Sequence, residues 1–194
     1  MAVLVAIIVI LTVFNIGNIP IGPIVATIYQ VPVIIGAVVL GTGAGAVLGG
    51  IWGVLCFILA ITGQTTDIVA LAVVQQNVFL YFIIAFVPRV MVGVVSGLVF
   101  RGFNSLLKEK KTPVSYGAAG ILGSLTNTVF YLGALYVFIR NLLASLYGIE
   151  VGAVGKMILG VAGTNGLVEA AVSCLIVAAV CTALEAVGKS GRRA

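Results

Sequence analysis

The sequence predicts an all-α membrane protein, a bundle of six transmembrane helices whose N and C termini are both cytoplasmic. Of its 194 residues, 62% are hydrophobic and 8% are charged, and the mean hydropathy is +1.31. These values lie far outside the range of soluble domains. The apolar runs are long and lack the alternating pattern of a membrane barrel, so helices are expected to cross the bilayer. We expect residues 1–194 to form a single integral membrane domain.

The first two predicted spans are short or interrupted. Residues 2–14 are apolar but fall short of the roughly 20 residues that a transmembrane helix needs. Asn, Gly and Pro punctuate residues 15–22, which predicts a loop. Residues 23–40 form the second predicted span, and Gln30 and Pro32 predict a kink in it, because proline removes a helical hydrogen bond.

A turn at residues 41–43 leads into the third predicted span, residues 44–61. Gly45, Gly49 and Gly53 recur there at every fourth position, and such a stripe lets another helix approach closely. We interpret the stripe as packing within the chain. Residues 62–76 then form a polar outer connection that includes Gln64, and this connection is a candidate cover for a binding site.

The fourth predicted span, residues 78–100, carries Pro88 and Arg89 well inside it. An intramembrane arginine costs at least roughly 2.5–3.5 kcal/mol on insertion scales unless it faces protein, water or a counter-charge. Pro88 has no N–H, so the carbonyl one turn earlier is left free and a kink is expected there. Two interpretations stay open for Arg89: a buried pair with Glu169 that only fixes helix packing, or contact with a ligand.

Two further spans complete the predicted bundle, residues 116–138 and 157–187, with a polar connection at residues 140–156 between them. If the N terminus is cytoplasmic, the inner side collects Arg101, Lys108, Lys110, Lys111, Lys189, Arg192 and Arg193, and the outer side keeps Arg140 and Lys156. The positive-inside rule favours this orientation. Topology therefore accounts for the net charge of +5, and we interpret residues 108–111 as a solvated inner loop that does not bind nucleic acid.

Polar side chains on three of these spans fall at one depth. Counted from the outer helix ends, the shared level lies roughly 10–18 Å below the outer surface at 1.5 Å per residue. The residues at this level are Arg89, Asn127, Tyr131, Asn165 and Glu169. Together with Gln64 on the outer connection, they are the candidate substrate-binding set for a small, polar, carboxylate-bearing solute. The alternative is three unrelated hydrogen bonds that fix helix packing.

The composition also argues against catalysis. The chain has no histidine, and its three cysteines lie inside apolar segments without ligand spacing, so we expect no metal site and no cofactor. No nucleophile elbow or phosphate-cradling glycine loop occurs. Asp67, Glu150 and Glu169 are isolated carboxylates, which leaves a membrane-embedded enzyme as a poor fit.

Five segments carry a resemblance that covers nearly the whole chain. They are residues 28–36, residues 40–46, the Pro88–Arg89 helix at residues 86–89, residues 123–128, and residues 163–166 with Glu169. With the six spans, they resemble the substrate-capture (S) components of energy-coupling-factor (ECF) vitamin transporters. Within that family the chain is most similar to the pantothenate-type subgroup.

The resemblance implies a bacterial cell-membrane protein that binds a vitamin outside and supplies no ATP chemistry of its own. The implied substrate is pantothenate, with riboflavin, folate, pyridoxine or a thiamine precursor as alternatives. The implied partners are a membrane coupling subunit and, through it, two cytosolic ATP-binding subunits. A stand-alone secondary carrier stays open, although the chain shows no internal repeat of the kind common in carriers.

The resemblance also implies a docking face on the first helix. Members of the family carry an A-x-x-x-A pattern there, which Ala2 and Ala6 match. Two alanines on one helical face let a partner helix approach closely in lipid.

Overall fold

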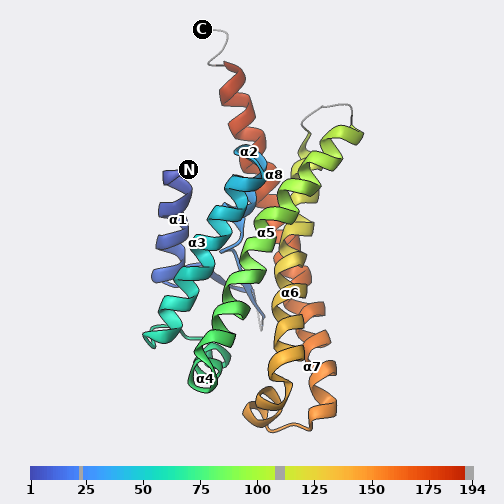
Figure 1. Cartoon of the computed structure of the whole chain (residues 1–194). Helices are drawn as coiled ribbons and strands as arrows, with labels where there is room; N and C mark the ends of the chain where they lie inside the picture. The colour runs from blue at the N-terminus through green and yellow to red at the C-terminus, as the bar shows by residue number, and fades with distance from the viewer. Residues whose placement is uncertain (22–23, 108–111, 191–194) are drawn as a thin grey trace.

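A computed structural model describes residues 1–21, 24–107 and 112–190, a bundle of helices with one short β-hairpin (Figure 1). The elements in chain order are α1 (Ala2–Val13), β1 (Asn18–Ile21), β2 (Ile24–Thr27), α2 (Val31–Val39), α3 (Thr42–Ile61), α4 (Ile68–Gln76), α5 (Val78–Leu106), α6 (Pro113–Tyr147), a 3-10 turn η1 (Val151–Ala153), α7 (Val154–Val161), a π-helical turn η2 (Ala162–Gly166) and α8 (Leu167–Ser190). The basic residues Lys108, Lys110, Lys111, Arg192 and Arg193 lie outside the described residues.

The chain after α1 differs from the predicted loop and span at residues 15–40. β1 and β2 pair antiparallel, with Asn18 opposite Thr27, so the all-α prediction is wrong for this segment. α2 has only nine residues, and all of those from Val31 to Val38 are buried. Short apolar runs rich in Val and Ile suit a strand as well as a helix. Non-helical backbone is tolerated at membrane depth where protein surrounds it or where it lines a cavity.

The glycine stripe of α3 packs against α5, as interpreted from the sequence. A Cβ atom on Gly45 would come within 2.9 Å of the Gly93 carbonyl oxygen, and one on Gly53 would come within 2.9 Å of the Phe86 Cα. A Cβ on Gly49 would collide with the backbone carbonyl of Arg89. The stripe therefore brings α3 against the turn of α5 that carries Arg89.

Gly49→Ala is expected to lower the stability of this helix pair. The added methyl meets backbone atoms that cannot rotate away, and overpacking of this kind costs about 1–3 kcal/mol of unfolding free energy. At the slope typical of a chain of this size, the thermal midpoint in detergent should fall by roughly 2–12 °C. Gly43→Ala is the matched control, because no atom of the described residues lies within 4 Å of its Cβ position. Equal midpoints for the two variants would contradict this account of the packing.

The two polar connections predicted at residues 62–76 and 140–156 are largely helical. Asp67 caps α4 by accepting hydrogen bonds at Oδ1 from the backbone N–H groups of Val69 (2.9 Å) and Ala70 (3.1 Å). α4 begins at Ile68 and buries Val69, Ala70 and Val73. Within residues 62–76, the irregular loop is therefore limited to residues 62–67. α6 passes through one non-helical residue, Ile139 (φ −134°, ψ 19°), and continues to Tyr147.

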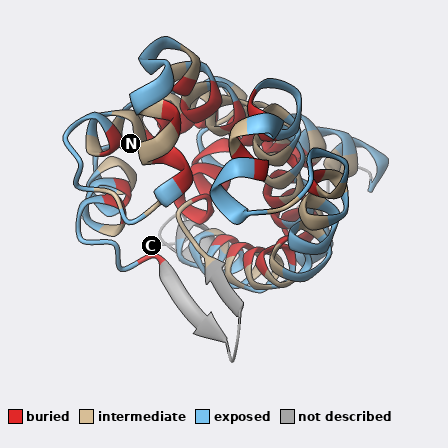
Figure 2. Ribbon diagram, turned by 90° about the horizontal axis from the view of Figure 1, so that it is seen from below, coloured by how far each residue is buried: buried red, intermediate tan, exposed pale blue. Residues whose placement is uncertain are grey.

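Four stretches of the described chain are long and apolar enough to cross a membrane. They are Thr42–Ile61, Val78–Leu106, Pro113–Tyr147 and Val151–Val187. Buried residues gather toward the inside of the bundle and exposed ones face outward (Figure 2). Many of the exposed side chains are large and apolar, such as Phe79 (77% exposed), Leu175 (72%) and Val137 (70%). An apolar outer surface of this kind suits a lipid environment.

Candidate functional site

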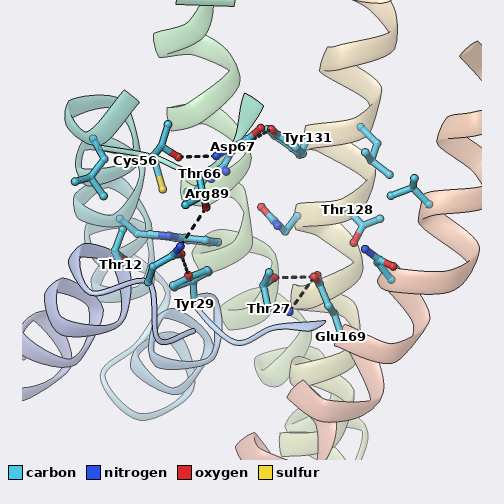
Figure 3. A pocket seen from close by; sticks show the side chains of 18 of the residues that line it. Thr12, Thr27, Tyr29, Cys56, Thr66, Asp67, Arg89, Thr128, Tyr131 and Glu169 are labelled. Carbon is cyan, nitrogen blue, oxygen red and sulfur yellow. Dashed lines mark hydrogen bonds between the residues drawn. The ribbon is translucent and has the colours of Figure 1, made fainter. Parts of the chain in front are cut away.

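A cavity of about 320 Å³ lies among the helices (Figure 3). Its volume is at the lower end of the roughly 300–1,000 Å³ range of small-molecule pockets. The end of α1, the segment after the hairpin, the loop at residues 62–67, and helices α3, α5, α6 and α8 all contribute to its wall. All six residues predicted as substrate-binding line it: Gln64, Arg89, Asn127, Tyr131, Asn165 and Glu169. That they contact a substrate stays a prediction.

Pro88 and Arg89 interact through the backbone of their own helix. Because Pro88 has no N–H, the carbonyl of Ile84 lacks its usual helical donor. The Arg89 guanidinium takes that place, with Nη1 donating to the Ile84 oxygen at 3.0 Å. The carbonyl one turn before Pro88 thus has a side-chain donor, and α5 runs through Pro88 as one 29-residue helix.

The rest of the Arg89 head group is surrounded by aromatic rings. Its Cζ atom lies 4.7 Å from the centre of the Tyr131 ring and 5.2 Å from that of Trp52. Both contacts are within cation–π range. Arg89 Nε is buried and has no hydrogen-bond partner, and no ion pair joins Arg89 to a carboxylate in the described part of the chain. The interpretation of Arg89 as a partner of Glu169 is therefore wrong for this structure.

Asp67 is the carboxylate on the Arg89 side of the cavity, and protein donors occupy both of its oxygens. Oδ1 caps α4, and Oδ2 accepts a hydrogen bond from the Tyr131 hydroxyl at 3.1 Å. Tyr131 thus joins the cap of α4 to the ring contact with Arg89. This pair fixes the position of the Tyr131 ring at the cavity wall.

Glu169 belongs to a separate polar group. Its Oε1 accepts from the Thr27 N–H at 3.1 Å and from the Thr27 hydroxyl at 2.7 Å, and its Oε2 accepts from Gln30 Nε2 at 3.5 Å. Gln30 is fully buried and also donates to Ser124 Oγ at 3.1 Å. These bonds tie the segment between β2 and α2 to α8 and α6. Figure 3 shows Glu169 with Thr27 on one side of the cavity and Arg89 with Cys56 on another.

The two predicted asparagines lie on α6 and in the π-helical turn η2. Asn127 Oδ1 is buried and has no hydrogen-bond partner among the described residues. Asn165 belongs to η2, which interrupts the predicted sixth span, and π-helical turns of this kind are frequent at functional sites. At Gly166, an added Cβ would lie 2.9 Å from Thr128 Cγ2, so η2 packs closely on α6. The arrangement keeps Asn165 at the cavity wall.

Several cavity residues were not predicted from the sequence. Trp52 and Tyr81 are buried at the wall, and Thr27 and Asp67 anchor other wall residues. Trp52 is the single tryptophan of the chain and lies between two glycines of the stripe on α3. A lone indole N–H in the middle of an apolar span needs a partner, and this signal could have identified it.

The cavity supplies hydrogen-bond donors, acceptors and aromatic surface, which suit reversible binding of a small polar solute. The described residues contain no group of His, Cys, Asp and Glu that could hold a metal ion.

Comparison with known proteins gives matches along most of the chain. Residues 1–181 match the family described as "ECF transporter, substrate-specific component", and this range includes every residue that lines the cavity. The pantothenic acid transporter PanT of Lactococcus lactis subsp. cremoris (strain MG1363) is 28% identical, over 95% of this chain and 91% of its own length. The pantothenate transporter PanT of Leuconostoc mesenteroides subsp. mesenteroides is 29% identical, over 84% of this chain and 79% of its own.

Proposed function

Because the chain belongs to the substrate-specific components of ECF transporters, we propose that its cavity binds pantothenate and presents it for ATP-driven uptake. Membership places the chain among the multi-pass proteins of bacterial membranes, as a substrate-binding transport subunit and not an enzyme. Its partners are accordingly a substrate and an ECF module. The identity of the substrate and the residues that bind it are our proposal.

The observation that carries the proposal is the state of Arg89. Its guanidinium lines the cavity and has no ion pair within the described residues, and its Nε has no hydrogen-bond partner. A buried charge of this kind is costly unless it gains a counter-charge. Pantothenate carries one carboxylate, and we assign that group to Arg89. The amide and the two hydroxyl groups then meet the polar wall formed by Asn127, Tyr131, Asn165 and Glu169, with Gln64 at the loop.

The named relatives support this choice of vitamin, since both matched transporters are described as carrying pantothenate. The size of the cavity agrees with a small vitamin, because about 320 Å³ is at the lower end of ligand pockets.

Calorimetry on the purified chain in detergent tests the proposal. Pantothenate should bind, and panthenol, which replaces the carboxylate by a hydroxymethyl group, should bind far more weakly. Riboflavin, folate, pyridoxine and thiamine serve as the comparison panel. Tight binding of another vitamin without binding of pantothenate would contradict the substrate assignment. Uptake by the purified chain alone in liposomes would instead indicate a stand-alone carrier.

In this proposal the chain crosses the membrane six times, with both termini in the cytoplasm. Figure 1 supports it, because the start of α1 and the end of α8 lie toward the same end of the bundle, where α5 also ends and α6 begins. α1 and the segment from β1 to α2 supply the two crossings that are not among the four long apolar stretches. A reporter that is active only in the cytoplasm should be active when fused after Ala194, and an inactive fusion that is well expressed would contradict this orientation.

The docking face for the coupling subunit is assigned to α1. Ala2 and Ala6 are exposed, as a surface for close approach of a partner helix requires. The two ATP-binding subunits act through the coupling subunit. The loop at residues 62–67 includes Gln64 and lines the cavity. This loop remains the candidate cover over the bound vitamin.

A further inference from the structure

Unpartnered polar atoms around the cavity are divided by type between its walls. Among the described residues that line the cavity, four buried side-chain atoms have no hydrogen-bond partner. Two are donors, Trp52 Nε1 on α3 and Arg89 Nε on α5, and one is an acceptor, Asn127 Oδ1 on α6. The fourth is the Thr12 hydroxyl on α1, which can donate or accept. The wall formed by α3 and α5 therefore offers donors, and the wall formed by α6 offers an acceptor. Buried polar atoms in proteins nearly always have partners, so this distribution describes the ligand that the cavity takes.

Glu169 adds a second acceptor beside α6. Thr27 supplies two donors to Oε1, the shorter at 2.7 Å, whereas Oε2 receives only Gln30 Nε2, at 3.5 Å. An ionised carboxylate has about four lone-pair sites, so Oε2 retains acceptor capacity. Glu169 lines the cavity and is 8% exposed, which places that capacity at the wall rather than in bulk water.

No cation of the described residues balances the Glu169 carboxylate. The described residues contain no ion pair that involves Glu169, and the donors that hold it come from the neutral residues Thr27 and Gln30. A buried carboxylate without a counter-charge is stabilised by additional donors and destabilised by a second anion. This part of the cavity therefore favours a ligand group with O–H or N–H donors and disfavours an acid.

We propose that Glu169 and Asn127 form an acceptor pole that selects hydroxyl groups at the end of the ligand opposite its carboxylate. The inference rests on the proposed function, because Arg89 is taken to hold the carboxylate. Thr27 and Gln30 are positioning residues in this arrangement, since they hold Glu169 and do not themselves select the ligand. The cavity is thus specific for molecules with an anion at one end and hydroxyl donors at the other.

Paired ligands and one variant test the acceptor pole. The ligands are pantothenate and N-(3,3-dimethylbutanoyl)-β-alanine, which keeps the carboxylate and the amide but lacks both hydroxyl groups. Loss of the hydroxyls should weaken binding to the unaltered chain by roughly 10- to 150-fold, the range for a hydrogen bond to a charged acceptor. In Glu169→Gln, the same loss should cost less, about 2- to 13-fold, since a hydrogen bond to a neutral acceptor is worth less. The fluorescence of Trp52 at the cavity wall and calorimetry both report binding.

Two results would overturn the acceptor pole: equal binding of the two ligands by the unaltered chain, or an equal penalty in both proteins. If Glu169→Gln does not fold, a dicarboxylate analogue with a carboxylate in place of the terminal hydroxymethyl group tests the unaltered chain directly. It should bind at least about 100-fold more weakly than pantothenate, because two buried carboxylates then meet. Tight binding of the dicarboxylate would overturn the inference. Failure of the proposed function is recognised separately, by panthenol binding as tightly as pantothenate.

Discussion

Arg89→Ala is expected to weaken pantothenate binding by about 2–5 kcal/mol, the usual cost of removing one partner from a buried, hydrogen-bonded charge pair. The reason is local. Among the described residues, the guanidinium has one backbone acceptor, the Ile84 carbonyl, and two aromatic rings, but no ion pair with a carboxylate. If the vitamin supplies that carboxylate, its affinity depends on Arg89 more than on any other side chain of the cavity. Calorimetry with pantothenate measures the change.

Three controls test whether the loss of affinity comes from the contact between Arg89 and the carboxylate of the ligand. Panthenol, which has no carboxylate, should lose little affinity in Arg89→Ala. Arg101→Ala removes an exposed arginine of the same helix and should leave pantothenate binding unchanged. Arg89→Lys should recover only part of the affinity, because an ammonium group lacks the planar fork of donors. Normal pantothenate binding by a folded Arg89→Ala protein would show that the carboxylate is held elsewhere in the cavity.

Ala6→Trp is expected to abolish ATP-driven uptake and to leave pantothenate affinity unchanged. Ala2 and Ala6 lie four residues apart on one face of α1, are exposed and do not line the cavity. A tryptophan at position 6 places a bulky ring where two backbones must approach closely. Affinity is measured on the isolated variant in detergent, and uptake is measured on the reconstituted complex with the coupling and ATP-binding subunits.

Ile7→Trp is the matched control for the docking face. Ile7 is 39% exposed on α1, but it lies about 100° around the helix from Ala6. The same added bulk should therefore leave uptake intact. Normal uptake by Ala6→Trp would show that this face of α1 does not dock the coupling subunit, and loss of uptake in both variants would indicate a general effect on α1.

Much of the helical framework could be predicted, because it depends on local properties of the chain. The third, fourth and fifth predicted spans correspond to α3, α5 and α6, and the glycine stripe packs within the chain as interpreted. The link between Pro88 and Arg89 was also predictable, since a missing N–H and the carbonyl that it leaves free are one turn apart.

The misassigned segments share a physical cause. The strands β1 and β2 and the helix α4 are short, and apolar residues in short runs do not distinguish a strand, a helix and a loop in a membrane setting. One backbone group of the hairpin is satisfied far along the chain, since the Thr27 N–H donates to Glu169. Such a bond leaves no periodic signal in the sequence.

The sequence by itself determined that this is a helical membrane protein, because hydropathy depends only on the order of residues along the chain. It also predicted that five polar residues lie at one depth, from the helical rise per residue. The five residues predicted at that depth and Gln64 of the outer connection meet at one cavity. Only the tertiary structure decided how they pair. Thr27 and Glu169 are 142 residues apart and meet at 2.7 Å, while Arg89 contacts Trp52 and Tyr131 instead of Glu169. Depth fixes one of the three spatial coordinates of a side chain. Hydrogen bonds and charge pairs depend on all three coordinates, and the other two are set by the packing of the helices around each other.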